Sequence, residues 1–146
     1  MALKETRATS AMAAVLVLTG ALWYLRDPSW LASYSSGFHP WQIASDGRPY
    51  RWTKGHASFF VPSDARRITV PLRSVNETPQ DWPVTATITI DDRVVDRVTF
   101  RDEDWHELSI RLPGNATRHV RRVDITVDRV RSRVRGIQAA TVEVSR

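Results

Sequence analysis

From Tyr50 onward, apolar and polar residues alternate along the chain with a period of two. Apolar side chains occupy every second position over 68–72, 84–90 and 123–127, and threonine, aspartate or arginine fills most positions between them. A period of two in stretches rich in Val, Ile and Thr predicts half-buried antiparallel strands. Strands are expected near residues 57–61, 66–73, 83–90, 93–100, 105–112, 120–128 and 137–144.

These strands predict the fold class. Strands with one apolar face must bury it, and two sheets packed face to face do so around a single core. Asp91-Asp92 lies between two alternating runs and predicts a tight hairpin turn. We therefore expect an antiparallel β-sandwich of the jelly-roll type over residues 50–146, preceded by a different kind of segment.

The N-terminal segment, residues 1–26, has the pattern of a transmembrane helix. The stretch Thr9–Leu25 contains no charged residue, and Lys4 and Arg7 precede it while Arg26 follows. Its length lies at the short end of the membrane-spanning range. The charge bias predicts a cytoplasmic N-terminus, so the chain would be a single-pass protein of the inner membrane with an extracytoplasmic domain. The alternative is a signal peptide cleaved after Ala21.

Residues 27–49 predict a tether between the helix and the sandwich. Pro28 ends the helix, and the serines and glycine that follow favour irregular backbone. The segment also holds four aromatic residues, which is more than a free linker carries. They would either pack on the domain or lie at the membrane surface. The aromatic residues are Trp30, Tyr34, Phe38 and Trp41.

Composition narrows the chemistry. The chain has 146 residues and no cysteine, which excludes disulfides, thiolate metal sites and cysteine nucleophiles. Its net charge is +5, and only two of its 21 basic residues are lysine. Four arginines at strand spacing near the C-terminus would share one face of an extended chain and could bind an anionic partner, or form a charged edge strand. They are Arg129, Arg131, Arg133 and Arg135.

No motif predicts an enzyme, a metal site or a cofactor. The four histidines are not in metal-ligand spacing, and neither a nucleophile elbow nor a glycine-rich phosphate loop occurs. The acidic run 102–104 could suggest glycoside hydrolysis or a calcium site, but a solvated hairpin loop explains it. His106 falls on an apolar strand face, where a structural role is expected. Nucleic acid is not an expected partner.

Tryptophan is the better candidate for ligand binding, because a sugar ring stacks its CH face on an exposed indole. Trp82 lies in the loop Pro79–Pro83 and is the most plausible platform. Trp41 and Trp105 are the other candidates. These three residues are the predicted glycan-binding positions.

The order of the motifs resembles a known group of domains. It includes Arg51-Trp52-Thr53, Ala57–Pro62, Ile68–Arg73, Val84–Arg93 and Trp105–Ile110, with a final Arg133–Ile137. Over residues 37 to 144 this order is similar to small jelly-roll, carbohydrate-binding-module-like domains on the extracytoplasmic side of bacterial membrane glycan proteins, including some glycosyltransferases. That group often has tryptophan and proline before its final arginine–glycine motif, where this chain has Arg129–Ser132.

The resemblance implies a non-catalytic envelope module. Such a module would bind a glycan or support a membrane protein of glycan assembly, such as a glycosyltransferase. The alternative is a protein–protein scaffold subunit of an envelope membrane complex, in which the small residues Ala13, Ala14, Gly20 and Ala21 would allow close helix packing.

Overall fold

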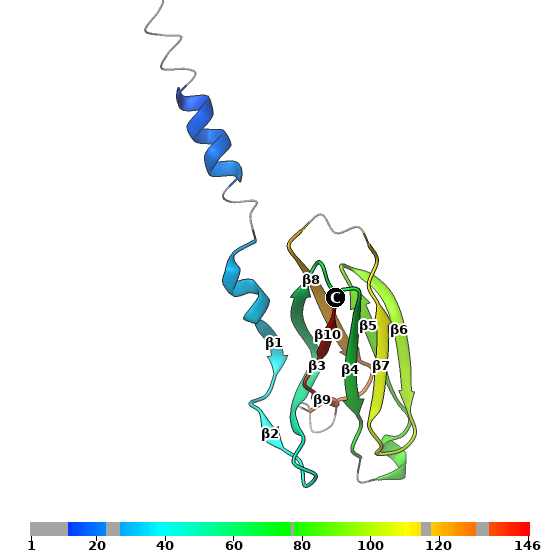
Figure 1. The fold of residues 1–146 in the computed structure, drawn as a ribbon. Helices are drawn as coiled ribbons and strands as arrows, with labels where there is room; N and C mark the ends of the chain where they lie inside the picture. Colours follow the sequence, from blue (N-terminus) through cyan, green and yellow to red (C-terminus); the bar gives the residue numbers. More distant parts are fainter. Residues whose placement is uncertain (1–11, 23–26, 77, 115–117, 131–134) are drawn as a thin grey trace, which may run out of the picture.

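The structure is a computed structural model that describes residues 12–22, 27–76, 78–114, 118–130 and 135–146. Its sandwich is built from ten antiparallel strands and two short 3-10 helices (Figure 1). The 3-10 helices are η1 (Ser29–Ser33) and η2 (Pro79–Asp81). The strands are β1 (Ser35–Phe38), β2 (Gln42–Ile43), β3 (Pro49–Pro62), β4 (Arg67–Arg73), β5 (Val84–Ile90), β6 (Arg93–Phe100), β7 (His106–Arg111), β8 (Val120–Val127), β9 (Gln138–Ala140) and β10 (Glu143–Ser145).

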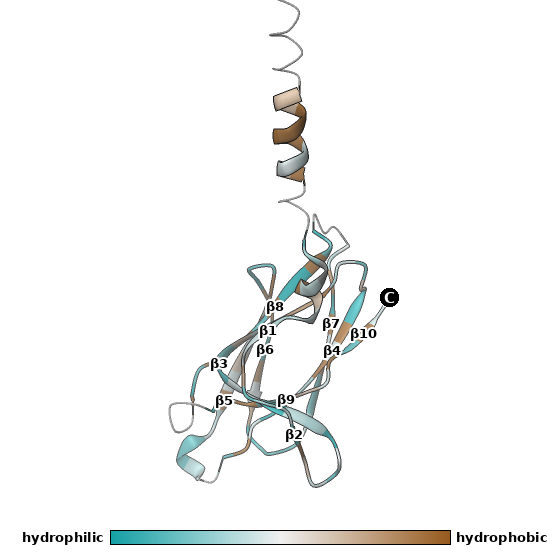
Figure 2. Ribbon diagram, turned by 90° about the vertical axis from the view of Figure 1, so that its left-hand side faces the viewer, coloured by the Kyte–Doolittle hydropathy of each residue, from teal (hydrophilic) through white to brown (hydrophobic). Residues whose placement is uncertain are grey.

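The strands form two layers joined by β3, which are seen edge-on in Figure 2. One layer has the order β1-β3-β8-β5-β6, and the other contains β2, β9, β4, β7 and β10 beside the first half of β3. Strand β3 changes layer near Gly55, whose φ of 95° is a conformation that favours glycine. This arrangement confirms the predicted antiparallel β-sandwich and is consistent with a jelly-roll.

The core follows from the alternation in the sequence. Along β5 the residues at even positions, Val84 to Ile90, are buried, and the threonines between them are only partly buried. On β4 of the other layer Ile68, Val70 and Leu72 are fully buried, and Phe100 closes the core beside them. Each fully buried side chain of this kind stabilises the fold by about 1.5–3 kcal/mol.

The predicted hairpin at Asp91-Asp92 is confirmed. Both residues have positive φ, 47° and 66°, and Ile90 pairs with Arg93 across the turn. This is the geometry of a two-residue hairpin whose twist matches that of the strands. The turn is fixed to β8, because the Asp91 N–H donates to the Arg122 carbonyl and the Arg122 N–H donates to Asp91 Oδ1, each at 3.0 Å.

The segment 27–49, which was predicted as a tether, packs onto the sandwich. Its two short strands both pair with β3, so it forms part of the sandwich. Gly37 has a φ of 71°, and a Cβ added there would lie 2.0 Å from the His56 carbonyl oxygen. Only glycine therefore allows β1 to approach β3 this closely. Phe38 packs against the core, with its ring centroid 6.5 Å from that of Phe59.

The predicted transmembrane helix falls only partly within the described residues. Residues 12–22 are helical and exposed, whereas 1–11 and 23–26, which carry the flanking charges, lie outside the described residues. Within the described part of the chain, no helix has the length and apolar character needed to span a membrane. The membrane anchor stays a prediction.

Candidate functional site

Two concavities lie on either side of η1. The first, which we call the aromatic groove, has a volume of about 300 Å³ and is lined by residues of 32–35, Trp41, Arg51 and 140–142. The second, which we call the arginine pocket, has a volume of about 700 Å³. Leu31 lines the pocket and Ala32 lines the groove, and Phe60 of β3 contributes to both. The segment 31–35 is therefore a wall shared by the two concavities.

Exposed rings stand at the aromatic groove. Trp41, in the loop between β1 and β2, is 50% exposed, and Tyr34, directly before β1, is 51% exposed. Both line the groove. Exposed aromatic rings beside a concavity offer flat apolar surface, on which another ring or a sugar can stack.

The Arg51 guanidinium packs against two aromatic rings at the groove. The Arg51 guanidinium lies 3.6 Å from the centroid of the Phe38 ring and 4.8 Å from that of Trp41. Its Nη1 donates to Ser35 Oγ at 2.8 Å. Burial of the guanidinium lowers the pKa of Arg51 from its ordinary value, although arginine stays charged at any physiological pH. The cation–π contacts orient Trp41.

The other two predicted tryptophans lie elsewhere. Trp82 is half-buried and packs against the core, so it is less exposed than a loop position suggested. Trp105 is half-buried under two guanidinium groups, those of Arg48 at 5.1 Å and Arg73 at 4.8 Å from the ring centroid. Its Nε1 is buried with no hydrogen-bond partner among the described residues. Of the three predicted tryptophans, Trp41 alone lines either concavity.

The predicted arginine row is only partly described. Arg131 and Arg133 lie outside the described residues. Arg129 is exposed and donates to the Gln80 carbonyl at 3.3 Å. Arg135 lies 5.7 Å from the centroid of the Trp52 ring. Neither residue lines the groove or the pocket.

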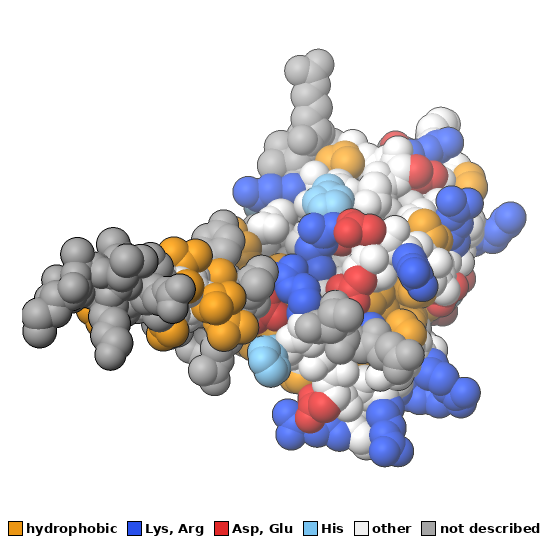
Figure 3. Space-filling view, turned by 90° about the horizontal axis from the view of Figure 1, so that it is seen from above, with side chains coloured by type: hydrophobic (Ala, Val, Ile, Leu, Met, Phe, Trp, Pro, Cys, Tyr) orange, Lys and Arg blue, Asp and Glu red, His pale blue; other side chains and the backbone are white. Residues whose placement is uncertain are grey.

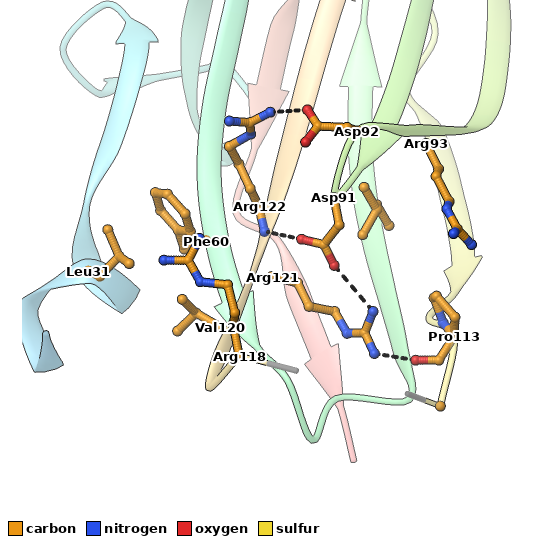
Figure 4. A pocket seen from close by; sticks show the side chains of 12 residues that line it. Leu31, Phe60, Asp91, Asp92, Arg93, Pro113, Arg118, Val120, Arg121 and Arg122 are labelled. Carbon is orange, nitrogen blue, oxygen red and sulfur yellow. Dashed lines mark hydrogen bonds and ion pairs between the residues drawn. The ribbon is translucent and has the colours of Figure 1, made fainter. Parts of the chain in front are cut away.

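A different set of arginines forms the pocket. In Figure 4, Arg121 and Arg122 from the start of β8 are directed to the hairpin turn, whereas Arg93 from the start of β6 points toward Pro113 and Arg118, just before β8, lies near Phe60. Figure 3 shows basic and acidic side chains next to one another over this end of the sandwich. The charged lining residues are Arg93, Arg118, Arg121, Arg122, Asp91 and Asp92.

Carboxylates fix three of these arginines. Arg121, whose side chain is 2% exposed, donates Nη1 to Asp91 at 3.3 Å and Nη2 to the Pro113 carbonyl. Arg122 donates Nε to Asp124 at 2.9 Å and Nη2 to Asp92. The Asp124 hydrogen bond raises the pKa of Arg122. Guanidinium groups held this way keep a fixed direction.

Asp27 joins the entering chain to the same end of the sandwich. Its side chain is 4% exposed and accepts hydrogen bonds from Arg118 Nε at 3.0 Å, Arg118 Nη2 at 2.5 Å and the His119 N–H at 3.0 Å. The hydrogen bond from Arg118 lowers the pKa of Asp27. The carboxylate therefore fixes the start of the described tether to the residues before β8.

One cluster has the residue types of a hydrolase but the wrong connectivity. Ser58 Oγ donates to Asp124 Oδ1 at 2.6 Å and lies 3.2 Å from His56 Nε2. His56 Nδ1 meets Thr126 Oγ1 at 3.2 Å, where a catalytic triad would place a carboxylate. Because the serine proton is directed to the carboxylate, the histidine is not positioned to remove it.

The described residues support a metal site or an acid–base pair no better than they support a hydrolase site. The described residues contain no group of three His, Asp or Glu side chains that could hold a metal ion. In the acidic loop Asp102 accepts from His106 Nε2 at 3.1 Å, which lowers the pKa of Asp102. The His106 ring also contacts Phe100 edge-on, with ring centroids 5.2 Å apart. These contacts fit the structural role expected for His106.

Comparison with known proteins finds likenesses among solved structures. No family model matches the sequence, and no curated protein matches it. Among solved structures, a family 35 carbohydrate-binding module from Clostridium thermocellum matches with 14% sequence identity and a TM-score of 0.49. The match covers 80% of this chain and 95% of that one. A likeness at this level does not indicate what this chain binds.

Proposed function

We propose that this chain is a non-catalytic module of the cell envelope that binds a glycan in the aromatic groove. The observation that carries the proposal is the half-exposed Trp41 ring, oriented by Arg51 at the rim of a concavity. A pyranose ring presents an apolar CH face that stacks on such an indole. The Ser35 and Thr141 side chains line the same groove and supply hydroxyl groups for the sugar.

The size of the groove suits a small part of a glycan. A volume of about 300 Å³ lies at the lower end of the range for ligand sites. The groove would therefore hold one or two sugar units, with the rest of the glycan in solvent. Since the groove is neutral apart from Arg51, whose guanidinium is engaged with Ser35 and two rings, a neutral sugar is the better ligand.

Membrane attachment is part of the same proposal. The uncharged stretch Thr9–Leu25 supports an anchor in the inner membrane with the sandwich on the extracytoplasmic side. Asp27 is bound to Arg118 and His119, so the sandwich would begin directly at the end of the anchor. A glycan held there would stay close to the membrane, near any membrane protein that assembles it.

The test is glycan binding by the full-length protein, on a glycan array followed by titration. We expect Trp41→Ala to weaken binding about five- to thirtyfold, because stacking on an aromatic ring contributes on the order of 1–2 kcal/mol. Ile43→Ala is the matched control, since Ile43 is an exposed apolar residue on neighbouring β2 that does not line the groove. Trp82→Ala should also leave the affinity unchanged when the variant stays folded.

Two results would contradict the glycan proposal. The first is the absence of any bound glycan on the array, and the second is an equal loss of affinity in Trp41→Ala and Ile43→Ala. If the protein instead co-purifies with one stoichiometric membrane partner, and replacement of residues 9–25 by polyleucine removes that partner, the scaffold alternative replaces the proposal.

A further inference from the structure

Among the described residues, one arginine side chain that lines the arginine pocket has no carboxylate partner of its own. Arg93, the first residue of β6, lines the pocket and is exposed, and its side chain has no hydrogen-bond or ion-pair partner among the described residues. The other arginines each meet a carboxylate. Asp27 binds Arg118, Asp91 binds Arg121, and Asp92 and Asp124 bind Arg122. The four arginines thus face four carboxylates in all, two of them on Arg122, and Arg93 keeps its guanidinium free for an external anion.

The paired arginines still have hydrogen-bond donors to spare. The guanidinium group has five N–H donors. Arg118 uses Nε and Nη2, and Arg122 uses Nε and Nη2, so the Nη1 group of each has no acceptor among the described residues. Arg121 uses both Nη groups, and its buried Nε has no partner. The carboxylates thus orient the arginines without saturating them.

The remaining lining of the pocket is apolar. Leu31, Phe60, Ile90 and Val120 line it together with Pro113. Figure 4 shows Leu31, Phe60 and Val120 grouped on one side, with Arg121 and Arg93 across from them. A bare inorganic ion gains nothing from such a wall. A ligand with a phosphate next to an organic group would place its charge on the arginines and its carbon atoms against the wall.

We propose that the arginine pocket binds a phosphate ester, with Arg93 as its free charged contact and Arg118 and Arg122 as preoriented donors. Arginine suits phosphate because its planar fork matches two phosphate oxygens. The phosphate could belong to an anionic lipid headgroup or to a soluble phosphorylated compound. The lipid source rests on the membrane attachment proposed above, whereas the phosphate site itself does not.

The position of the pocket favours the lipid. Asp27 is held at the residues before β8, and Leu31, four residues later, lines the pocket. If residues 1–26 anchor the chain, the pocket lies at the end of the sandwich that meets the membrane surface. Cationic side chains at that surface are attracted to anionic lipid headgroups.

The experiment uses the full-length protein, labelled with nitrogen-15, and follows the Nε–H signals of Arg118 and Arg122 by NMR. In one arm the protein is placed in phosphatidylcholine nanodiscs with or without 20% phosphatidylglycerol. In the other arm the protein in phosphatidylcholine nanodiscs is titrated with glycerol 3-phosphate, and sodium chloride of equal ionic strength serves as the salt control. The variants are Arg93→Gln and Arg97→Gln.

Arg97 provides the matched control because it is also exposed on β6, carries the same charge and does not line the pocket. We expect Arg93→Gln to weaken phosphate binding about tenfold, which is the effect of one charge-assisted hydrogen-bonded contact. Arg97→Gln should change binding less than twofold. Neither residue is buried, so both variants are expected to fold.

Signals that move only with phosphatidylglycerol support the site with a lipid source. Signals that move with glycerol 3-phosphate, and not with the nanodisc composition, support it with a soluble source. Equal effects of sodium chloride, equal losses in the two variants, or no movement in either arm would overturn the proposal. Trp41→Ala should leave phosphate binding unchanged, which separates failure of this site from failure of the glycan groove.

Discussion

The aromatic groove and the arginine pocket use arginine in opposite ways. In the groove, the Arg51 guanidinium packs against the rings of Phe38 and Trp41 and orients them, so the exposed ring of Trp41 is the surface offered to a ligand. In the pocket, carboxylates lie beside the arginines and orient them, so the surface offered is cationic. The same side chain is thus a support in one concavity and the contact surface in the other, and its neighbours decide which.

The two concavities are nevertheless coupled through one wall. The segment 31–35 lies between them, and Phe60 lines both. A change that displaces this segment should damage both sites, whereas a change behind one site should damage that site alone. Variants of the shared wall and variants behind a single site can therefore distinguish effects on both sites from effects on one site.

The largest effect is expected from Gly37→Ala. The new Cβ would lie 2.0 Å from the His56 carbonyl, at a φ of 71° that alanine adopts poorly. We expect β1 to separate from β3 and the free energy of unfolding to fall by about 3 kcal/mol. Both the groove and the pocket should lose their ligands, as measured by urea unfolding and by the two binding assays.

Gly47→Ala is the control for this prediction. Gly47 also has a positive φ, 81°, but no atom lies within 4 Å of an added Cβ. Gly47→Ala should lower the free energy of unfolding by about 1–2 kcal/mol, from backbone strain alone, and leave both sites intact. Equal losses of stability and of binding in the two variants would show that the close contact of β1 with β3 does not support the shared wall.

A change behind the pocket should affect the pocket alone. Arg121→Met keeps much of the buried volume but leaves Asp91 and the Pro113 carbonyl without their donor. Because Asp91 is 46% exposed and can be hydrated, we expect a loss of about 2 kcal/mol rather than the full 3–5 kcal/mol of a buried pair. Phosphate binding should fall while glycan binding stays unchanged, and a parallel loss of both would contradict the separation.

The hydrogen bonds of Asp27 with Arg118 and the His119 N–H, which we call the Asp27 clamp, should have a smaller and pH-dependent effect on stability. Its pKa lies below the ordinary value of 3.8 in the folded protein, so its contribution is complete above 3.8 and is lost as the pH falls below that value. Asp27→Asn should lower the free energy of unfolding by about 1 kcal/mol at neutral pH, and the difference should shrink in acid.

Asp64→Asn is the control for the clamp. Asp64 forms a 3.1 Å ion pair with Arg146 in which both side chains are mostly exposed. Such a surface pair contributes about 0–1 kcal/mol, so the control should change stability less than Asp27→Asn. A loss in Asp27→Asn that persists unchanged at pH 2 would show that the carboxylate charge is not what fixes the tether.

The sequence predicted the strands of the sandwich well, because half-buried strands impose a period of two on their residues. The predicted runs 66–73, 83–90 and 93–100 correspond closely to β4, β5 and β6. The alternation could not reveal β1 and β2, which have four and two residues and lie around Gly37 and a proline. The predicted final strand is divided into β9 and β10, where its pattern was least regular.

The two sites were predicted less completely, for different reasons. Trp41 was a candidate because it lies outside the predicted membrane segment and a sugar ring can stack on an exposed indole, but nothing in the sequence showed that Arg51 would lie against it. The pocket joins Arg93 to residues 118–122, and only the pairing of β6 with β5 and of β5 with β8 brings them together. The one local signal was a two-residue acidic turn followed directly by Arg93.

The smallest effect is expected from Arg51→Lys, which keeps the charge of the groove and removes the planar group. A lysine ammonium would still attract the ring of Trp41, but it cannot stack on Phe38 while it reaches Ser35. Cation–π contacts at a partly exposed site contribute about 0.5–1 kcal/mol, so glycan affinity should fall two- to fivefold and phosphate binding should not change. The anisotropy of tryptophan fluorescence should fall with it, since Trp41 would turn more freely. If glycan affinity falls while the anisotropy stays constant, Arg51 contacts the sugar directly, and the groove then uses its arginine as the pocket does.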